Sequence, residues 1–325
     1  MFEKIVKEVH LGKLISTPVR VYGGLTHKMF MLETEKGKFV VKILNENIMK
    51  RPNAMKNFEK ADTLECVLKD NYIPCVYPLT TNGKKMYKID GFYMYVYPFY
   101  SGQSLSQEEI GIKQVKMIGE VVSKIHNIDI REGMNTIPDK KIDFKKYIDL
   151  AKEKKSVIYD YLYDMLDILN TSLENGNNAI KYAPMVSAIC HNDLDSKNVL
   201  WNGDEYRIID LECLCYSNPY LELMTLALCW SGYEENNLNI ELFKAFIDEY
   251  KKNTKLDMNI DWESIYYLNN DRLSWLEFNI KRSLMIECDS KEEQELGIKE
   301  VKKTIKHVLY YDKIKETILR TLKKD

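Results

Sequence analysis

The sequence predicts an α+β fold in which a small β-rich lobe precedes a larger helical lobe. Short β-prone runs separated by turns fill residues 1–98, whereas long stretches with helical spacing of apolar residues follow. The chain has 325 residues, which is long enough for two lobes that each bury a core. We expect the junction at Pro98, with one lobe over residues 1–98 and the other over residues 99–325.

The first lobe is expected to be a sheet with one helix. Apolar residues at three-to-four spacing predict the helix over residues 57–69. Asp90-Gly91 separates two of the β-prone runs and is a hairpin signal. The expected strands lie at residues 19–22, 29–33, 38–44 and twice within 86–97.

The second lobe is expected to be almost entirely helical. Ser106 is a candidate N-cap, and the apolar spacing after it predicts a long helix that ends near His126. The only β signal is a hairpin around Asn202-Gly203, because Asn-Gly between β-prone runs favours a tight turn. Further helices are expected at residues 144–173, 221–230, 240–252, 262–287 and 291–324.

The segment around this hairpin, CHNDLDSKNVLWNGDEYRIIDLE, concentrates polar side chains at its two ends. A hairpin that closes between Gly203 and Glu205 places Asn198 roughly opposite Asp210, with Asp193 just upstream. Oxygen ligands of this kind suit a hard cation. The segment therefore predicts a Mg²⁺ site.

A second stretch predicts contact with an anion. Gly23-Gly24 follows a strand, and a glycine pair allows backbone N–H groups to approach a phosphate, although many hairpins use Gly-Gly as a plain turn. Lys42 stands in a run that reads as a buried strand, where an ammonium needs a partner or an anionic ligand. The alternative for Lys42 is an edge strand with its amine in water.

The partner of Lys42 is expected from the helix over residues 57–69. Glu59, Asp62 and Glu65 are the candidates, and we favour Glu59.

Composition excludes several classes of protein. No apolar stretch is long enough for a transmembrane helix, and the N-terminal residues are too charged for a signal peptide. The seven Cys residues are scattered, which favours reduced thiols in the cytoplasm, and their spacing is a poor zinc signal. No dense basic patch indicates nucleic acid. We expect a monomer or weak dimer with neither a membrane nor a nucleic-acid partner.

Charge is unevenly divided along the chain. Residues 1–100 hold 16 basic and 10 acidic residues, a net charge of +6. The remainder holds 31 basic and 39 acidic residues, a net charge of −8. This fits a basic lobe that faces an anion and an acidic lobe that faces a cation, although a random imbalance over solvated faces explains it equally well.

Taken in chain order, these features resemble the protein-kinase-like phosphotransferases. The interval from Asp193 to Asn198 matches that of a kinase catalytic loop. His191-Asn192-Asp193 replaces His-Arg-Asp, Asp210-Leu211-Glu212 replaces Asp-Phe-Gly, and no Ala-Pro-Glu follows. The pattern from about Val19 to Trp230 is instead similar to the aminoglycoside phosphotransferase and choline kinase superfamily, which phosphorylates hydroxyls of small molecules.

The resemblance implies a protein-kinase-like two-lobe fold and a nucleotide site. Gly23 and Gly24 resemble the loop over the ATP phosphates, and Lys42 resembles the lysine on the α- and β-phosphates, oriented by Glu59. Adenine recognition would use a carbonyl of Pro98 and an N–H of Tyr100. The alternative interpretation of this stretch is an aromatic core cluster. ATP is the expected nucleotide, with GTP left open.

The resemblance also implies the catalytic and metal groups. Asp193 resembles the residue that receives or orients the proton of the acceptor hydroxyl, and Asn198 and Asp210 resemble the Mg²⁺ ligands. His191 resembles a scaffold residue that holds the loop. Asp195 departs from the pattern, because many members of the family carry His or another polar residue there.

The acceptor is expected to be a small cationic or polyhydroxylated molecule bound by acidic residues. The candidates are Asp195, Glu212, Asp271, Glu277 and Glu287, with a solvated face as the alternative for Asp271 and Glu277. An aminoglycoside-like antibiotic, and hence antibiotic resistance, is the favoured hypothesis. Choline, ethanolamine or a sugar-like metabolite is the second, and a catalytically silent, coat-associated structural protein is the third.

Overall fold

The computed structural model describes residues 1–21, 27–134, 137–286, 288 and 290–323. The chain forms two compact units. The first unit contains Met1–Glu109 together with His191–Cys215, and the second contains Ile110–Cys190 with Tyr216–Asp325. The expected junction at Pro98, with lobes of residues 1–98 and 99–325, stays a prediction.

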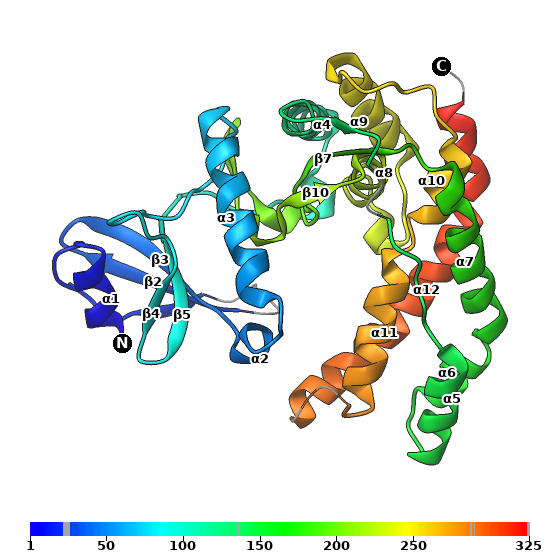
Figure 1. Ribbon diagram of the computed structural model, residues 1–325, viewed down its shortest axis with the longest axis horizontal. Helices are drawn as coiled ribbons and strands as arrows, with labels where there is room; N and C mark the ends of the chain where they lie inside the picture. The colour runs from blue at the N-terminus through cyan, green and yellow to red at the C-terminus, as the bar shows by residue number, and fades with distance from the viewer. Residues whose placement is uncertain (22–26, 135–136, 287, 289, 324–325) are drawn as a thin grey trace. The chain divides into compact units, whose positions relative to one another are not determined.

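The first unit is built on a five-stranded antiparallel sheet with the order β1-β2-β3-β5-β4 (Figure 1). The predicted strands of this region are present, and the predicted turn at Asp90-Gly91 separates β4 from β5. The strands are β1 (Val19–Val21), β2 (Lys28–Thr34), β3 (Gly37–Ile43), β4 (Tyr87–Ile89) and β5 (Phe92–Pro98). The helices are α1 (Phe2–Glu8), α2 (Glu46–Met49), α3 (Ala54–Asp70) and the 3₁₀ turn η1 (Gln107–Glu109).

Helices α1 and α3 cover opposite faces of this sheet (Figure 1). Val41 and Ile43 of β3 pack with α1, whereas Leu44, just beyond β3, packs with Phe58 of α3. Side chains of a strand alternate between its faces. Lys42 therefore points to the α3 face, at a position where only 5% of the residue is exposed.

The predicted hairpin belongs to the first unit. It consists of β8 (Val199–Asn202) and β9 (Glu205–Ile208), preceded by the 3₁₀ turn η3 (Ser196–Asn198) and followed by η4 (Leu211–Cys213). Backbone hydrogen bonds join β9 to the segment after α3, since Ile208 donates to Pro74 and Val76 donates to Ile208. These bonds fix the hairpin against the lobe that carries Lys42.

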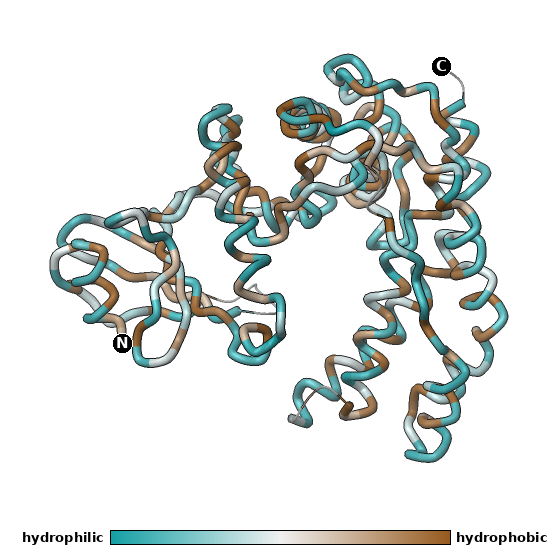
Figure 2. The backbone as a smooth tube through the Cα atoms, viewed as in Figure 1, coloured by the Kyte–Doolittle hydropathy of each residue, from teal (hydrophilic) through white to brown (hydrophobic). Residues whose placement is uncertain are grey.

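The second unit is mainly helical, as predicted. Figure 2 shows hydrophobic and hydrophilic residues alternating along α7 and α11, the pattern of helices that bury one face. The helices are α4 (Ile112–His126), α5 (Phe144–Glu153), α6 (Tyr159–Tyr163), α7 (Leu166–Ala179), α8 (Pro219–Cys229), α9 (Ile240–Asn253), α10 (Trp262–Leu268), α11 (Asp271–Ser283) and α12 (Lys291–Leu322), with 3₁₀ turns η2 (Ile180–Tyr182) and η5 (Tyr233–Glu235).

Two predicted helices are interrupted. The stretch 144–173 contains α5, α6 and part of α7. Lys155, with a left-handed φ of 50°, separates α5 from α6, and Asp164 and Met165 separate α6 from α7. The stretch 262–287 contains α10 and α11, separated by Asn269 and Asn270, which leave helical geometry. Apolar residues continue at helical spacing across these breaks, so spacing alone did not reveal them.

A small sheet in the part of the chain after Pro98 was not predicted. Strands β10 (Cys215–Ser217), β7 (Val186–Cys190) and β6 (Arg131–Glu132) form it in that order. All five residues of β7 are buried, so they lack the alternation that marks a strand with one exposed face. The expectation that the hairpin is the only β structure in this part is therefore wrong.

The core of the second unit contains a buried polar cluster. His126 Nδ1 lies 2.7 Å from the hydroxyl of Tyr250, and Nε2 lies 2.7 Å from Glu222 Oε2 and 3.6 Å from Cys190 Sγ. These contacts use both ring nitrogens of the histidine. Because the ligand-type atoms already satisfy one another, we interpret the cluster as packed core rather than as a metal site.

Within the described ranges, none of the helices combines the length and the hydropathy that crossing a bilayer requires.

Candidate active site

Lys42 lies at the centre of an ion-pair cluster. Its Nζ lies 2.6 Å from Asp210 Oδ1 and also contacts Glu212 Oε2. Burial alone would lower the pKa of Lys42, but the two carboxylates outweigh it and raise the pKa above its ordinary value. A buried, firmly protonated lysine is thus held beside two carboxylates.

The β8–β9 hairpin delivers these carboxylates. Its turn consists of Gly203 and Asp204, and Gly203 adopts φ 60°, which a glycine accepts without strain. After β9 the chain turns sharply at Asp210, whose φ and ψ are 65° and 59°. This left-handed residue opens η4 and brings Asp210 and Glu212 to the lysine.

The predicted register of the hairpin is wrong by one residue. Val199 pairs with Ile208, and Ile209 donates its N–H to the carbonyl of Asn198 at 2.9 Å. Asn198 therefore stands opposite Ile209 rather than Asp210. The reason is the two-residue turn, which closes one position earlier than a loop extending to Glu205 would.

Glu212 has its two oxygens in different contacts. His27 Nε2 lies 3.0 Å from Oε1, while Lys42 contacts Oε2. Burial favours the neutral acid, but the hydrogen bond with His27 and the charge of Lys42 lower the pKa of Glu212 to about 2. In the structure Glu212 contacts Lys42 and His27. Its predicted contact with an acceptor stays a prediction.

Asp193 and Asn198 meet in the loop before the hairpin. The Asn198 amide donates to the Asp193 carbonyl at 2.7 Å and to Asp193 Oδ2 at 3.0 Å. Burial, assisted by the neighbouring carboxylates of Asp195 and Asp210, raises the pKa of Asp193 against the opposing charge of Lys197. The loop thus holds an ionisable carboxylate whose proton affinity is increased.

Asp195 and His191 shape this loop. Asp195 Oδ1 accepts the N–H of Lys197 at 3.1 Å, and Oδ2 pairs with the Lys197 ammonium at 2.6 Å. His191 is buried, and its Nδ1 accepts the N–H of Asp193 at 3.3 Å. Both side chains contact the loop itself, so the acceptor role predicted for Asp195 stays a prediction.

The expected pairing of Lys42 with Glu59 differs from the structure. Glu59 lies on the exposed side of α3, whereas the carboxylates that contact Lys42 come from the hairpin. The other α3 acids also have partners, since Asp62 accepts from the hydroxyl of Tyr95 and Glu65 pairs with Lys85. Residues 57–69 could not reveal this, because the true partners are 168 and 170 positions from Lys42.

The end of β5 and the residue after it stay paired with β3, and the predicted connection and adenine contacts of Pro98 and Tyr100 stay predictions. Pro98 faces Phe39 across the ladder, and the N–H of Phe99 donates to the carbonyl of Lys38. The ring of Tyr100 lies beneath the guanidinium of Arg207, 5.5 Å away. Gly23 and Gly24 lie outside the described residues.

The acidic residues predicted on α11 lie in the second unit. Asp271 is 90% exposed and pairs with Lys140. Glu277 accepts a hydrogen bond from the hydroxyl of Tyr147 at 2.6 Å and pairs with Lys281 at 3.4 Å. Glu287 lies outside the described residues.

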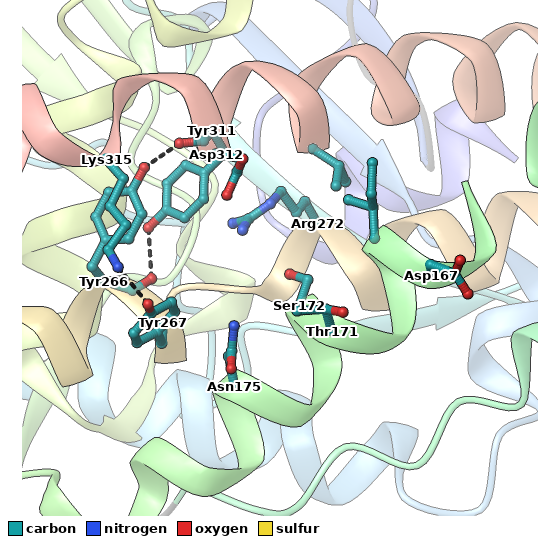
Figure 3. A pocket seen from close by; sticks show the side chains of 12 residues that line it. Asp167, Thr171, Ser172, Asn175, Tyr266, Tyr267, Arg272, Tyr311, Asp312 and Lys315 are labelled. Atoms are coloured by element: carbon teal, nitrogen blue, oxygen red, sulfur yellow. Dashed lines mark hydrogen bonds between the residues drawn. The ribbon is translucent and has the colours of Figure 1, made fainter. Parts of the chain in front are cut away.

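The second unit also contains a cavity of about 250 Å³ between α7, α10, α11 and α12 (Figure 3). Tyr266 and Tyr311 stack in its wall with ring centroids 4.1 Å apart, and Arg272 lies 3.6 Å from the Tyr311 centroid. Lys315 pairs with Glu263 and Tyr267. Both cationic side chains of the wall, Arg272 and Lys315, lie over aromatic rings.

His27 was not predicted from the sequence. It follows the glycine pair by three residues, and its contact with Glu212 spans 185 positions. No local periodicity or motif could indicate such a contact.

The sequence profile of the phosphotransferase enzyme family, APH, matches residues 18–263. Comparison with curated protein sequences returns no significant match.

Three solved structures illustrate the likeness in fold. A spectinomycin phosphotransferase in complex with ADP and spectinomycin has a TM-score of 0.68 at 15% identity, covering 96% of this chain and 97% of that one. An amicoumacin kinase in complex with AMP-PNP, Ca²⁺ and amicoumacin has a TM-score of 0.61 at 12% identity, covering 93% of this chain and 92% of that one. The ethanolamine kinase of Plasmodium vivax has a TM-score of 0.54 at 18% identity, covering 89% of this chain and 81% of that one. The fold is therefore that of the protein-kinase-like phosphotransferases.

Proposed function

Because the chain belongs to the phosphotransferase enzyme family and is a small-molecule phosphotransferase, we propose that it transfers the γ-phosphoryl group of ATP to a hydroxyl of a small cationic acceptor. An aminoglycoside-like antibiotic is the favoured acceptor class. The observation that carries the proposal is the 2.6 Å ion pair between Lys42 and Asp210, beside the Asp193–Asn198 pair. Phosphoryl transfer needs this combination of cation, carboxylates and a proton acceptor in one place.

Lys42 is the proposed phosphate ligand. Its raised pKa keeps it cationic, and its burial on β3 fixes the ammonium in one position. A fixed cation in a partly desolvated site stabilises developing negative charge more than a mobile surface lysine would. In the proposed reaction, Lys42 exchanges part of its contact with the carboxylates for the oxygens of the nucleotide.

Asp210 and Asn198 fit the requirements of a Mg²⁺ site. Asp210 supplies a carboxylate, and Asn198 uses its amide nitrogen toward Asp193, which leaves its side-chain oxygen to act as a ligand. When bound, Mg²⁺ would neutralise phosphate charge and orient the γ-phosphoryl group. The role of the two side chains is to present oxygen atoms at the open end of the hairpin, just before β8 and just after β9.

Asp193 is the proposed proton acceptor. Its raised pKa increases its affinity for the proton that the acceptor hydroxyl loses, and Asn198 restrains one of its oxygens. An oriented carboxylate of this kind also positions the hydroxyl for attack on the γ-phosphorus. The acceptor oxygen forms a bond to phosphorus, ADP leaves, and the proton passes to Asp193.

The nucleotide is proposed to lie along the first unit. Gly23 and Gly24 would approach the phosphates, and the backbone of Pro98 and Tyr100 would contact the adenine. Complexes of two structurally similar proteins contain ADP or AMP-PNP, which supports ATP over other donors. Use of ATP also favours a cytoplasmic location.

The acceptor class rests on charge and on the structural relatives. The similar structures contain spectinomycin and amicoumacin as small-molecule ligands. Residues 101–325 carry the net charge of −8, which suits a cationic molecule. Asp271 and Glu277 remain proposed contacts, although each already has a partner within the second unit.

A metabolite kinase is the second candidate, favoured by the structural likeness to an ethanolamine kinase. The test for both is ADP release from MgATP with a panel of aminoglycosides, spectinomycin, choline, ethanolamine and sugars. We expect stimulation by one cationic compound and none in the Asp193→Asn variant. Absence of MgATP binding would instead favour a catalytically silent structural protein.

A further inference from the structure

His27 occupies a buried position between three segments of the first unit. Its side chain is 5% exposed and lies directly before β2. The N–H of Asn45, at the end of the β3 connection, donates to Nδ1 at 3.0 Å. On the other side of the ring, Nε2 lies 3.0 Å from Glu212 Oε1.

These two contacts define where the imidazole carries its proton. A backbone N–H can only donate, so Nδ1 must present its lone pair to Asn45. A neutral imidazole then carries its hydrogen on Nε2, which faces an oxygen of Glu212 that can only accept. An imidazolium would direct a second N–H at the donor of Asn45, so the geometry selects the neutral Nε2–H form.

We infer that His27 is a positioning residue: it donates Nε2–H to Glu212 and thereby holds the carboxylate that contacts Lys42. The inference rests on the proposed function, because it assigns His27 to the same site. Glu212 has one oxygen on His27 and the other on Lys42, so the histidine determines which way the carboxylate turns. A fixed Glu212 in turn limits where the ammonium of Lys42 can lie relative to Asp210.

The same contact joins two parts of the site that are distant in sequence. His27 follows the glycine pair that is proposed to cover the phosphates, while Glu212 belongs to η4 at the end of the hairpin. Partners that orient a ligand through a hydrogen bond commonly change affinity or activity by about 10- to 100-fold when removed. His27 therefore acts on the nucleotide through Glu212 and Lys42 rather than by touching it.

The alternative is that His27 only fills space. Its ring lies 6.5 Å from that of Phe58, at the edge of the apolar cluster on the α3 face of the sheet. Packing and hydrogen bonding can be separated by substitution. His27→Phe keeps a ring of similar shape but removes both hydrogen bonds, whereas His27→Gln keeps a side-chain N–H donor for Glu212.

The first measurement is the ¹⁵N spectrum of the histidine side chains in the intact protein without nucleotide. We expect His27, assigned by its disappearance in His27→Gln, to show an unprotonated Nδ1 and a protonated Nε2. A spectrum with the proton on Nδ1, or on both nitrogens, would overturn the inference. This measurement does not depend on whether the protein binds a nucleotide.

The second measurement is MgADP affinity by calorimetry. We expect binding to be about tenfold weaker in His27→Phe and within about threefold of wild type in His27→Gln. His10→Asn is the matched control, because His10 is exposed in the same unit and Asn tolerates its positive φ of 58°. Unchanged affinity in His27→Phe, or equal losses in both variants, contradicts the inference.

Two further outcomes are informative. If His27→Phe does not fold, the affinity of His27→Gln and the ¹⁵N spectrum decide the question, and a tenfold loss in His27→Gln contradicts the inference. If the wild-type protein binds no MgADP, the proposed function fails, whereas the spectrum still decides whether His27 holds Glu212.

Discussion

Replacing Glu212 by Gln should destabilise the protein in a pH-dependent manner. The ordinary pKa of 4.5 falls to about 2 in the folded protein because of His27 and Lys42. That difference corresponds to about 3 kcal/mol of folding free energy at neutral pH. It is a ceiling, since Lys42 retains Asp210 as a partner when residue 212 carries no charge, and since a neutral His27 offers Glu212 a hydrogen bond without a charge.

The direction of the pH dependence follows from the lowered pKa. A carboxylate with a depressed pKa contributes its full stabilisation above the unfolded value of 4.5 and loses it as the pH falls toward about 2. The free energy of unfolding of wild type should therefore exceed that of Glu212→Gln by up to about 3 kcal/mol near pH 7, and by less than half of that near pH 3.

Urea unfolding at several pH values measures this difference directly. Glu59→Gln is the matched control, because Glu59 is an exposed acid on α3 of the same unit. Its substitution should change the free energy of unfolding by no more than about 0.5 kcal/mol. Equal destabilisation of Glu212→Gln at pH 7 and pH 3, or none at either, would refute the ion-pair reasoning.

Three further predictions concern the reaction. Asp193→Asn should lower transfer by about 10²-fold or more while leaving nucleotide affinity nearly intact, and a rate within tenfold of wild type would contradict its role as proton acceptor. Asp210→Ala and Asn198→Ala should each weaken the Mg²⁺ dependence of ATP binding in calorimetry, and unchanged dependence in both would exclude them as metal ligands. Affinity for the acceptor should fall as ionic strength rises, because screening weakens attraction between a cation and acidic residues. A neutral or anionic acceptor, or an affinity insensitive to salt, would argue against an acidic pocket.

The sequence predicts local structure well because local signals determine it. Asn202-Gly203 between β-prone runs indicates a hairpin, and the hairpin is present with its turn at Gly203. Lys42 in an apolar strand indicates a buried ammonium, and the residue is buried. Strand position and helix spacing depend on neighbours a few residues away, which the sequence shows directly.

The partners across the site were harder to predict because they depend on tertiary geometry. Glu59 lies off the buried face of α3, which includes Phe58 and Ala61, and helical spacing cannot show that the partners of Lys42 come from the distant hairpin. The turn of the hairpin is one residue shorter than predicted. Because register depends on turn length, Asn198 lies opposite Ile209 and not opposite Asp210. Strand β7 lacks alternation because both of its faces are buried.

The first unit is discontinuous in sequence, and this constrains how the protein can be made. Its N-terminal part ends at Glu109, but His191–Cys215 must join before the unit is complete. During synthesis on the ribosome, Lys42 therefore emerges long before Asp210 and Glu212, and its ammonium has to stay hydrated until they arrive. The sheet can form early, but burial of the lysine must be a late event that waits for 81 intervening residues from 110 to 190. Nascent chains that stall within those residues should consequently expose this face to chaperones and proteases, whereas release beyond Cys215 should protect it.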